Sequence, residues 1–224
     1  MSGWGGLVRR ASTGVFQDRR EAGRILAQKL VSYRGKPGLL VLGLARGGIP
    51  VGWEVASFLN APLEVFLVRK LGVPKWPELA MGALASGGGV LINDDLVRRL
   101  GVSEQDVANT IAREKLELAR RERAYRDDRP PTDVRGRTVI LVDDGIATGS
   151  SMIAALRALR DAAQLVVAVP VGPASVCREL REAADDVVCA SCPPEFDSVG
   201  QAYADFHQVS DDEVRELLAT PTTD

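Results

Sequence analysis

The sequence has few of the residues on which many hydrolases and small exported domains depend. It contains a single histidine, His207, and three cysteines, Cys177, Cys189 and Cys192. No G-x-S-x-G segment is present, so a Ser-His-Asp hydrolase would lack its nucleophile turn and would have only His207 as a base. An odd number of cysteines in a chain without an export signal also argues against a disulfide framework.

Excess charge of one sign and long apolar runs are missing as well. The formal net charge is -2, so there is no overall positive field to hold nucleic acid. No apolar run approaches the ~20 residues of a membrane span. Residues 1–15 lack the apolar segment of a signal peptide and are expected to form a loose extension. We therefore expect a cytoplasmic protein with neither a nucleic-acid nor a membrane partner.

Cys189 and Cys192 form a C-x-x-C pair, which occurs in redox and zinc sites. The pair lies at the end of a valine-rich run, with no second pair and one distant histidine. Two thiolates do not complete a four-ligand zinc site. We therefore expect these cysteines to have a structural role.

Five short runs are almost continuously apolar, as is typical of strands that are covered on both faces. Helical patterns lie between most of them, and the alternation of strand with helix predicts a doubly wound parallel α/β sheet flanked by helices. The runs are 39–45, 63–68, 139–142, 165–172 and 187–191; the main helical patterns are 18–31, 50–59, 150–162 and 174–183.

One insert, at about 71–131, interrupts this alternation. Residues 71–79 are expected to form a loop, followed by a hairpin about the triple glycine at 87–89. A long charged helix should start at Ser103, capped with the help of Asp106, and end near Arg126 before two prolines. Its charges are expected to form a solvated face.

The segment VILVDDGIATGSS, residues 139–151, combines an apolar strand, two acids and a loop of small and hydroxyl residues. Asp143 and Asp144 would be costly to bury unless hydroxyl groups or a cation lay beside them. The loop offers hydroxyl donors, and the helix that follows offers unpaired N–H groups, which together suit a phosphate. A sugar phosphate would suit this segment, with its hydroxyl groups at the acids and its phosphate at the loop and helix terminus. The segment matches neither a Walker A nor a Rossmann fingerprint, and its simplest alternative is a capped strand-helix junction.

Two further groups of basic residues end strands at the same expected edge of the sheet. Arg46-Gly47-Gly48 follows the first strand, where glycines let backbone N–H groups approach an anion and the arginine can clamp it. Arg69 and Lys70 follow the second strand. The alternatives are a basic turn before a helix and a pair of surface cations.

VILVDDGIATGSS resembles the 5-phosphoribosyl-1-diphosphate (PRPP) motif of type I phosphoribosyltransferases. The resemblance implies that Asp143 and Asp144 bind the ribose hydroxyls. It implies a 5′-phosphate site at Ile146, Ala147, Thr148, Gly149, Ser150 and Ser151, and a diphosphate site at Ala45, Arg46, Gly47, Gly48, Arg69 and Lys70. A cis peptide is expected near Ala45–Arg46. From about Phe16 to Leu218 the chain resembles a bacterial group of phosphoribosyltransferases whose acceptor is unassigned, so residues 16–218 are expected to form one domain.

The resemblance implies transfer of the phosphoribosyl group from PRPP to a small nitrogenous acceptor, with release of diphosphate. Asp143, Asp144, Arg46 and Lys70 would be the catalytic residues. Mg²⁺ would be bound through PRPP, with Asp143 and Asp144 as its candidate protein ligands, and a homodimer is typical of the fold. A PRPP-binding or nucleotide-binding regulatory module without catalysis is the alternative. A receiver-like phosphoacceptor domain fits less well, because its acids precede no such loop.

The family pattern is broken at Ala147, where the hypoxanthine-guanine enzymes carry an aspartate. This departure argues against a 6-oxopurine acceptor handled in that way and leaves the acceptor open. A small hood at about 189–218 is expected to cover the base, with Phe196 or Tyr203 either stacking on it or packing in the core. Lys75 is a candidate lid residue.

Overall fold

A computed structural model describes residues 16–126 and 132–223, so the expected N-terminal extension and the two prolines expected to end the long helix lie outside the described residues. The body is built on a five-stranded sheet in the order β2-β1-β6-β7-β8, in which every neighbouring pair is parallel. All five predicted strands are present: β1 (Leu39–Leu44), β2 (Leu63–Phe66), β6 (Thr138–Val142), β7 (Gln164–Val171) and β8 (Asp186–Ser191).

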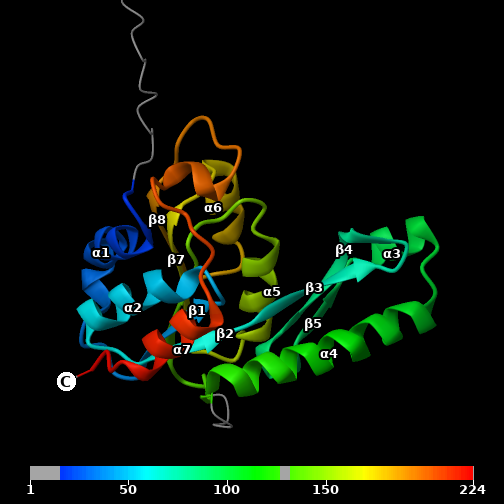
Figure 1. The fold of residues 1–224 in the computed structure, drawn as a ribbon, viewed down its shortest axis with the longest axis horizontal. Coiled ribbons are helices and arrows are strands. Elements are labelled where there is room, and N and C mark those ends of the chain that lie inside the picture. Colours follow the sequence, from blue (N-terminus) through cyan, green and yellow to red (C-terminus); the bar gives the residue numbers. More distant parts are fainter. Residues whose placement is uncertain (1–15, 127–131, 224) are drawn as a thin grey trace, which may run out of the picture.

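Helices cover both faces of this sheet, as the apolar runs predict (Figure 1). Alternate residues of one strand belong to different apolar clusters: Leu141 packs with α5 (Ser150–Ala158) and α6 (Ala174–Leu180), whereas Ile140 packs with α1 (Arg19–Lys29) and α2 (Gly48–Leu59). Because successive strand side chains point to opposite faces, a strand must be apolar throughout to fill both clusters. The doubly wound α/β fold is confirmed.

The insert forms an arm that projects from the body (Figure 1). It contains a three-stranded antiparallel sheet, β3 (Val68–Val73), β4 (Trp76–Ala85) and β5 (Val90–Ile92), with α3 (Asp94–Leu100) and α4 (Glu104–Arg126). The predicted hairpin about the triple glycine is confirmed as β4–β5. The predicted loop at 71–79 is wrong, because β3 and β4 pair through it.

A backbone irregularity at Gly72 explains why this pairing is hard to see in the sequence. The register of β3 on β4 shifts on both sides of Gly72, so the apolar residues lose their regular alternation. A Cβ on Gly72 would lie 2.3 Å from the carbonyl oxygen of Pro77. Glycine therefore permits the close approach of the two strands at this point.

The C-terminal helix α7 (Asp211–Ala219) joins the arm to the body. Its Val214 and Leu217 share an apolar cluster with Ile49 of the body and Leu118 of the arm. Three short 3₁₀ helices complete the described chain: η1 (Val31–Tyr33), η2 (Ser86–Gly88) and η3 (Val199–Ala202). Among the described residues, no helix is both long and apolar enough to cross a membrane. The division of the chain into domains stays a prediction.

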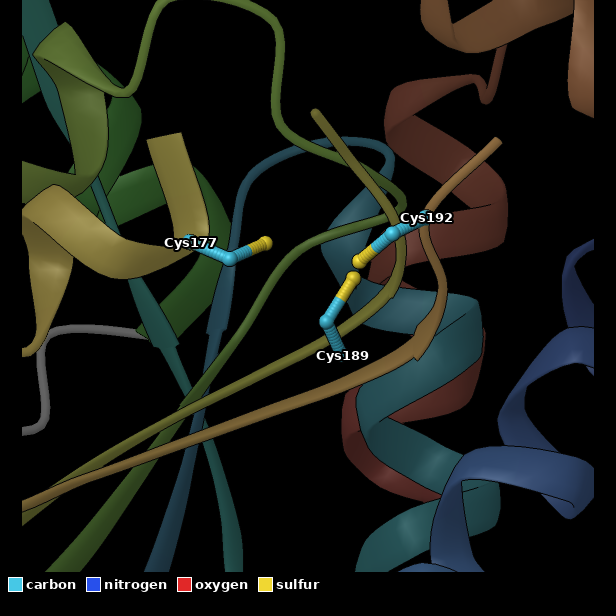
Figure 2. Close-up of side chains that lie close together, drawn as sticks. All are labelled: Cys177, Cys189 and Cys192. Atoms are coloured by element: carbon cyan, nitrogen blue, oxygen red, sulfur yellow. The ribbon is translucent and has the colours of Figure 1, made fainter. Parts of the chain in front are cut away.

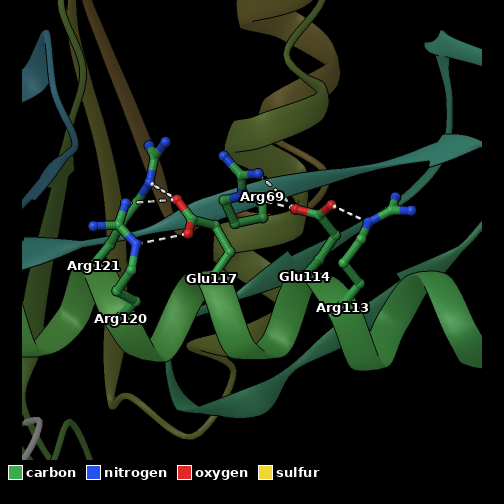
Figure 3. Close-up of polar contacts among 6 residues, drawn as sticks. All are labelled: Arg69, Arg113, Glu114, Glu117, Arg120 and Arg121. Atoms are coloured by element: carbon green, nitrogen blue, oxygen red, sulfur yellow. Dashed lines mark hydrogen bonds and ion pairs between the residues drawn. The ribbon is translucent and has the colours of Figure 1, made fainter.

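Helix α4 begins as the sequence predicts and is held to β3 by a partly buried ion pair. The Ser103 hydroxyl accepts from Asp106 N at 3.1 Å. Farther along, Arg69 of β3 donates from Nη2 to Glu114 Oε2 at 2.6 Å (Figure 3). Desolvation raises the pKa of Glu114, but hydrogen bonds from Arg69 and Arg113 outweigh it, so the pKa lies below its usual value.

One turn farther along α4, Glu117 pairs with Arg120 and Arg121 on the same helix (Figure 3). Hydrogen bonds from these two arginines lower the pKa of Glu117 to about 2. All three residues lie on α4, so the hydrogen bonds among them hold no second element, in agreement with the predicted solvated face.

Glu114 and Glu117 therefore offer a matched test of what fastens the arm helix. Glu114→Ala should lower the free energy of unfolding by about 1–3 kcal/mol, because Arg69 loses a charged hydrogen-bond partner. Glu117→Ala should cost much less, since water screens an exposed pair. Urea unfolding of both variants measures the difference, and equal losses would contradict the assignment.

Candidate active site

The candidate site is centred on the two acids that follow β6. Both carboxylates are half-buried, and Asp144 N donates to Asp143 Oδ1 at 2.8 Å. The loop after β1 presses directly against them. A Cβ on Gly47 would lie 2.0 Å from Asp144 Oδ2, and one on Gly48 would lie 2.6 Å from the carbonyl oxygen of Val142. Only glycines allow this contact, which brings the two predicted ligand-binding loops together.

Arg19 is the cation that accompanies the acids. Its Nε donates to Asp144 Oδ2 at 2.8 Å, and its Nη1 donates to the backbone oxygen of His207 at 2.8 Å. The guanidinium carbon lies 4.0 Å from the ring centroid of Phe206, and the residue is only 7% exposed. One buried side chain therefore connects α1, the acidic pair and the C-terminal segment.

The sequence reading missed Arg19, although a signal for it exists. Helix α1 buries positions 19, 22, 23 and 26, the spacing of one helix face. A charged residue at the first position of an otherwise apolar stripe needs a partner in the interior. The partner itself could not be identified, because Asp144 lies 125 residues away in the sequence.

Burial dominates the electrostatics of the acids. Desolvation, followed by repulsion from Asp144, raises the pKa of Asp143 well above its ordinary value. Desolvation also raises the pKa of Asp144, and the hydrogen bond and charge of Arg19 act against it. The protein thus holds two carboxylates close together where ionisation of both is unfavourable, which is costly unless a ligand uses them.

The loop from Gly145 to Gly149 leads into an open helix terminus. Ile146 is buried and its N–H donates to the Val171 carbonyl at 2.9 Å, whereas Ala147 and Thr148 are exposed. Gly149 has a φ of +75° and caps α5 without a side chain. The first N–H groups of an α-helix have no intrahelical partner, so this terminus can receive an anion.

The loop after β1 contains the expected cis peptide, between Ala45 and Arg46. Ala45 N donates to the Phe66 carbonyl at 3.0 Å, which places this loop beside the end of β2. The Arg46 side chain is partly exposed, and its Nη1 lies 3.6 Å from Asp211 Oδ1 of α7. Arg46 is therefore at the edge of the site, with its guanidinium directed toward α7 in this structure.

A cavity of about 180 Å³ joins Lys70, Asp143 and the predicted phosphate loop. Its lining includes Asp143, which follows β6, and Lys70 of β3. The lining also includes Val199 of η3, which the sequence reading missed and which places the C-terminal segment at the site. The remaining lining residues are Gly145, Ile146, Ala147, Thr148, Gly149, Ser150, Ser151 and Met152.

Asp144 and residues 45–48 adjoin this cavity without lining it, and four further predicted residues point elsewhere. Arg69 faces α4 through its pair with Glu114, opposite to Lys70. Lys75 lies in the exposed turn between β3 and β4. Phe196 and Tyr203 pack in an apolar cluster with Phe16, and the Tyr203 hydroxyl donates to the Asp144 carbonyl at 2.5 Å. Tyr203 is 6% exposed and supports the acidic loop through this hydrogen bond.

The acids could also contribute to a magnesium site. The contacts described above occupy one oxygen of each carboxylate, namely Asp143 Oδ1 and Asp144 Oδ2. Mg²⁺ is usually held by one or two carboxylates together with substrate phosphates and water. Two carboxylates beside an open helix terminus fit that donor set.

The unfavourable burial of two carboxylates predicts that Asp143→Asn stabilises the protein. Because the folded pKa is raised, ionisation of Asp143 costs stability, and the cost appears as pH rises through that pKa. The variant should be more stable than the wild type by about 0.5–2 kcal/mol at neutral pH, with the difference vanishing in acid. Thermal unfolding across pH measures it.

Asp144→Asn provides the contrast, since Arg19 would lose its carboxylate partner. Asp144→Asn should raise the free energy of unfolding by less than Asp143→Asn does, or should lower it. An equal or larger gain would show that burial of the pair, and not the pairing with Arg19, sets the balance.

Comparison with known proteins gives the family. The family model described as phosphoribosyl transferase domain matches residues 85–206. A Mycobacterium tuberculosis protein found in two strains under the name "Putative phosphoribosyl transferase" is 46% identical over 206 residues, which are 91% of this chain and 46% of that protein. The chain thus spans about half the length of these curated relatives.

A crystal structure from Thermus thermophilus is similar over nearly its whole length. It is 41% identical to this chain, with a TM-score of 0.77, and the match covers 91% of this chain and 97% of the other. With the family match, the parallel sheet and the acid-loop-helix junction after β6, the chain belongs to the phosphoribosyl transferase domain family and has the type I fold.

Proposed function

We propose that the protein transfers the 5-phosphoribosyl group of PRPP to a nitrogen nucleophile and releases diphosphate. The observation that supports this most is the cavity of about 180 Å³, in which Asp143, Lys70 and residues 145–152 meet. A sugar that carries anionic groups at two positions needs an acceptor of hydroxyl hydrogen bonds between two anion sites. The acid Asp143, the cation Lys70 and the loop with its helix terminus, which line this cavity, support such a site.

The sugar would lie against the acids. Each carboxylate has one oxygen outside the contacts with Asp144 N and Arg19, so the pair can accept hydrogen bonds from two neighbouring hydroxyls. Arg19 and the Tyr203 hydroxyl hold the acidic loop in place. Such preorganisation reduces the cost of fixing the sugar for reaction.

The 5′-phosphate would lie at the start of α5. Thr148 Oγ1 and Ser150 Oγ are 3.1 Å apart, so both hydroxyls can turn toward one anion. The positive end of the helix dipole acts in the same direction. The exposed position of the Thr148 and Ser150 side chains leaves them accessible to a ligand.

The diphosphate would lie between the loop after β1 and Lys70. The Gly47-Gly48 backbone is already against the acids, and Arg46 lies beside it at the site edge. As the C1–O bond breaks, its electron pair leaves with diphosphate, and these cations stabilise that charge. The nitrogen lone pair forms the new bond to C1, and the nitrogen then releases its proton. Mg²⁺ held by Asp143, Asp144 and diphosphate would supply Lewis-acid stabilisation.

A larger cavity of about 540 Å³ extends from this site between the arm and α5. It shares Lys70, Ser150 and Ser151 with the smaller cavity, and Asn93 and Asp94 of the arm line its other side. Closure of the arm over this space would exclude water from the reacting sugar. We assign the arm this covering role.

The first test is calorimetric titration of PRPP with Mg²⁺ into the wild type and the Asp143→Asn/Asp144→Asn double variant. We expect binding to the wild type and at least about 100-fold weaker binding to the variant, since two charged hydrogen-bond acceptors are lost. Circular dichroism confirms that the variant is folded. Absence of binding to the folded wild type would refute the PRPP site.

Turnover then separates an enzyme from a binding module. Diphosphate release is measured with PRPP, Mg²⁺ and a panel of nucleobases and amines. Release that depends on one acceptor supports the transferase. Tight PRPP binding without release for any acceptor would instead favour the regulatory module.

Lys70 and Arg69 make a second, more local test. Lys70→Met should weaken PRPP binding about tenfold through loss of one cation at the anion site. Arg69→Met should change binding little, because Arg69 faces Glu114. Calorimetry on both folded variants compares their affinities for PRPP. A larger loss of affinity in the Arg69 variant would indicate that the diphosphate lies on the other face of β3.

A further inference from the structure

The three cysteines, which are scattered in the sequence, converge in the structure. Cys177 comes from α6, Cys189 from β8 and Cys192 from the segment that follows β8. Their sulfur atoms all lie within 4.8 Å of one another, and Figure 2 shows the three side chains directed toward a common point. Among residues 16–126 and 132–223, no other group of three or more metal-ligating side chains converges in this way.

The cluster is open on one side. Cys177 is buried, Cys189 is half-buried and Cys192 is exposed. A cavity of about 600 Å³ opens beside the sulfurs and is lined also by three cations, Lys29, Arg178 and Arg181. The remaining lining residues, Ala174, Val187 and Val188, carry no acid. These three cations would offset the negative charge of bound thiolates, the form in which cysteine binds metals.

We propose that Cys177, Cys189 and Cys192 form a three-thiolate site for a thiophilic metal ion of the zinc class, with a fourth position open to the cavity. Tetrahedral zinc with Zn–S bonds of about 2.3 Å holds its sulfurs about 3.8 Å apart. The sulfurs are within 4.8 Å in the structure, so side-chain rotation suffices to bring them to that spacing. Thiolates select such soft cations over Mg²⁺.

This assignment revises the structural reading of the C-x-x-C pair. That reading counted two ligands, because Cys177 lies on a separate helix and no spacing rule connects it to the pair. With three thiolates and a solvent ligand, the coordination of zinc is complete.

The position of the site indicates what the ion would do. Cys177 Sγ would be 3.6 Å from a Cβ on Gly172, and that Cβ would be 3.2 Å from the carbonyl oxygen of Ile146. Val176, the neighbour of Cys177, packs beside Gly149. The ion would therefore tie α6, on which the loop 145–149 rests, to the end of β8, from which the C-terminal segment departs.

The test is a titration of the reduced full-length chain with Co²⁺, which reports thiolate ligation through its charge-transfer and visible absorption bands. We expect one ion per chain, displacement by Zn²⁺ and protection of all three thiols from alkylation. Zn²⁺ should also raise the melting temperature. Absence of thiolate-cobalt absorption, or protection of only Cys189 and Cys192, would overturn the proposal.

Variants assign the ligands. Cys177→Ser and Cys192→Ser should each weaken cobalt binding at least tenfold, and Cys192 is the safer change because it is exposed. His207→Ala is the control: it removes the single histidine, whose ring contacts Asp205 and Glu213 instead. Loss of binding in the His207 variant, or retention in Cys192→Ser, would refute the three-thiolate site. None of these readouts involves PRPP.

Discussion

The buried contact between Arg19 and Asp144 is the interaction on which the site depends. A parallel strand ends here in two adjacent carboxylates, and burial of such a pair without a cation would cost several kcal/mol. Arg19 is held in turn by the His207 carbonyl and the Phe206 ring. The first helix, the acidic loop and the C-terminal segment therefore form a single polar unit, and the remainder of the fold positions its parts.

Much of this arrangement could be read from the sequence, because the signals are local. The strands are continuous apolar runs, and a doubly wound sheet places their carboxyl ends along one edge. The acid pair, the small loop and the helix terminus follow one strand without interruption, so this part of the candidate site could be predicted from VILVDDGIATGSS alone. The close approach at Gly47 and Gly48 is also consistent with the glycine pair that the sequence shows.

The parts that sequence reading missed are those that depend on distant contacts. Arg19 becomes meaningful only when α1 packs near β6, and Cys177 becomes a third thiol only when α6 lies beside β8. Strand β3 escaped notice because the register shift at Gly72 breaks its alternation. The different orientations of Arg69 and Lys70 follow from a pairing partner, Glu114, that lies on a helix 45 residues away.

The absence of a side chain at Gly47 has a mechanical consequence. The same oxygen, Asp144 Oδ2, accepts from Arg19 and lies where a Cβ of residue 47 would be. Neither the loop after β1 nor the loop after β6 can shift toward the other without collision, and neither can withdraw without opening a void beside a charged group. The two loops therefore share a fixed spacing, which is set by a single carboxylate oxygen.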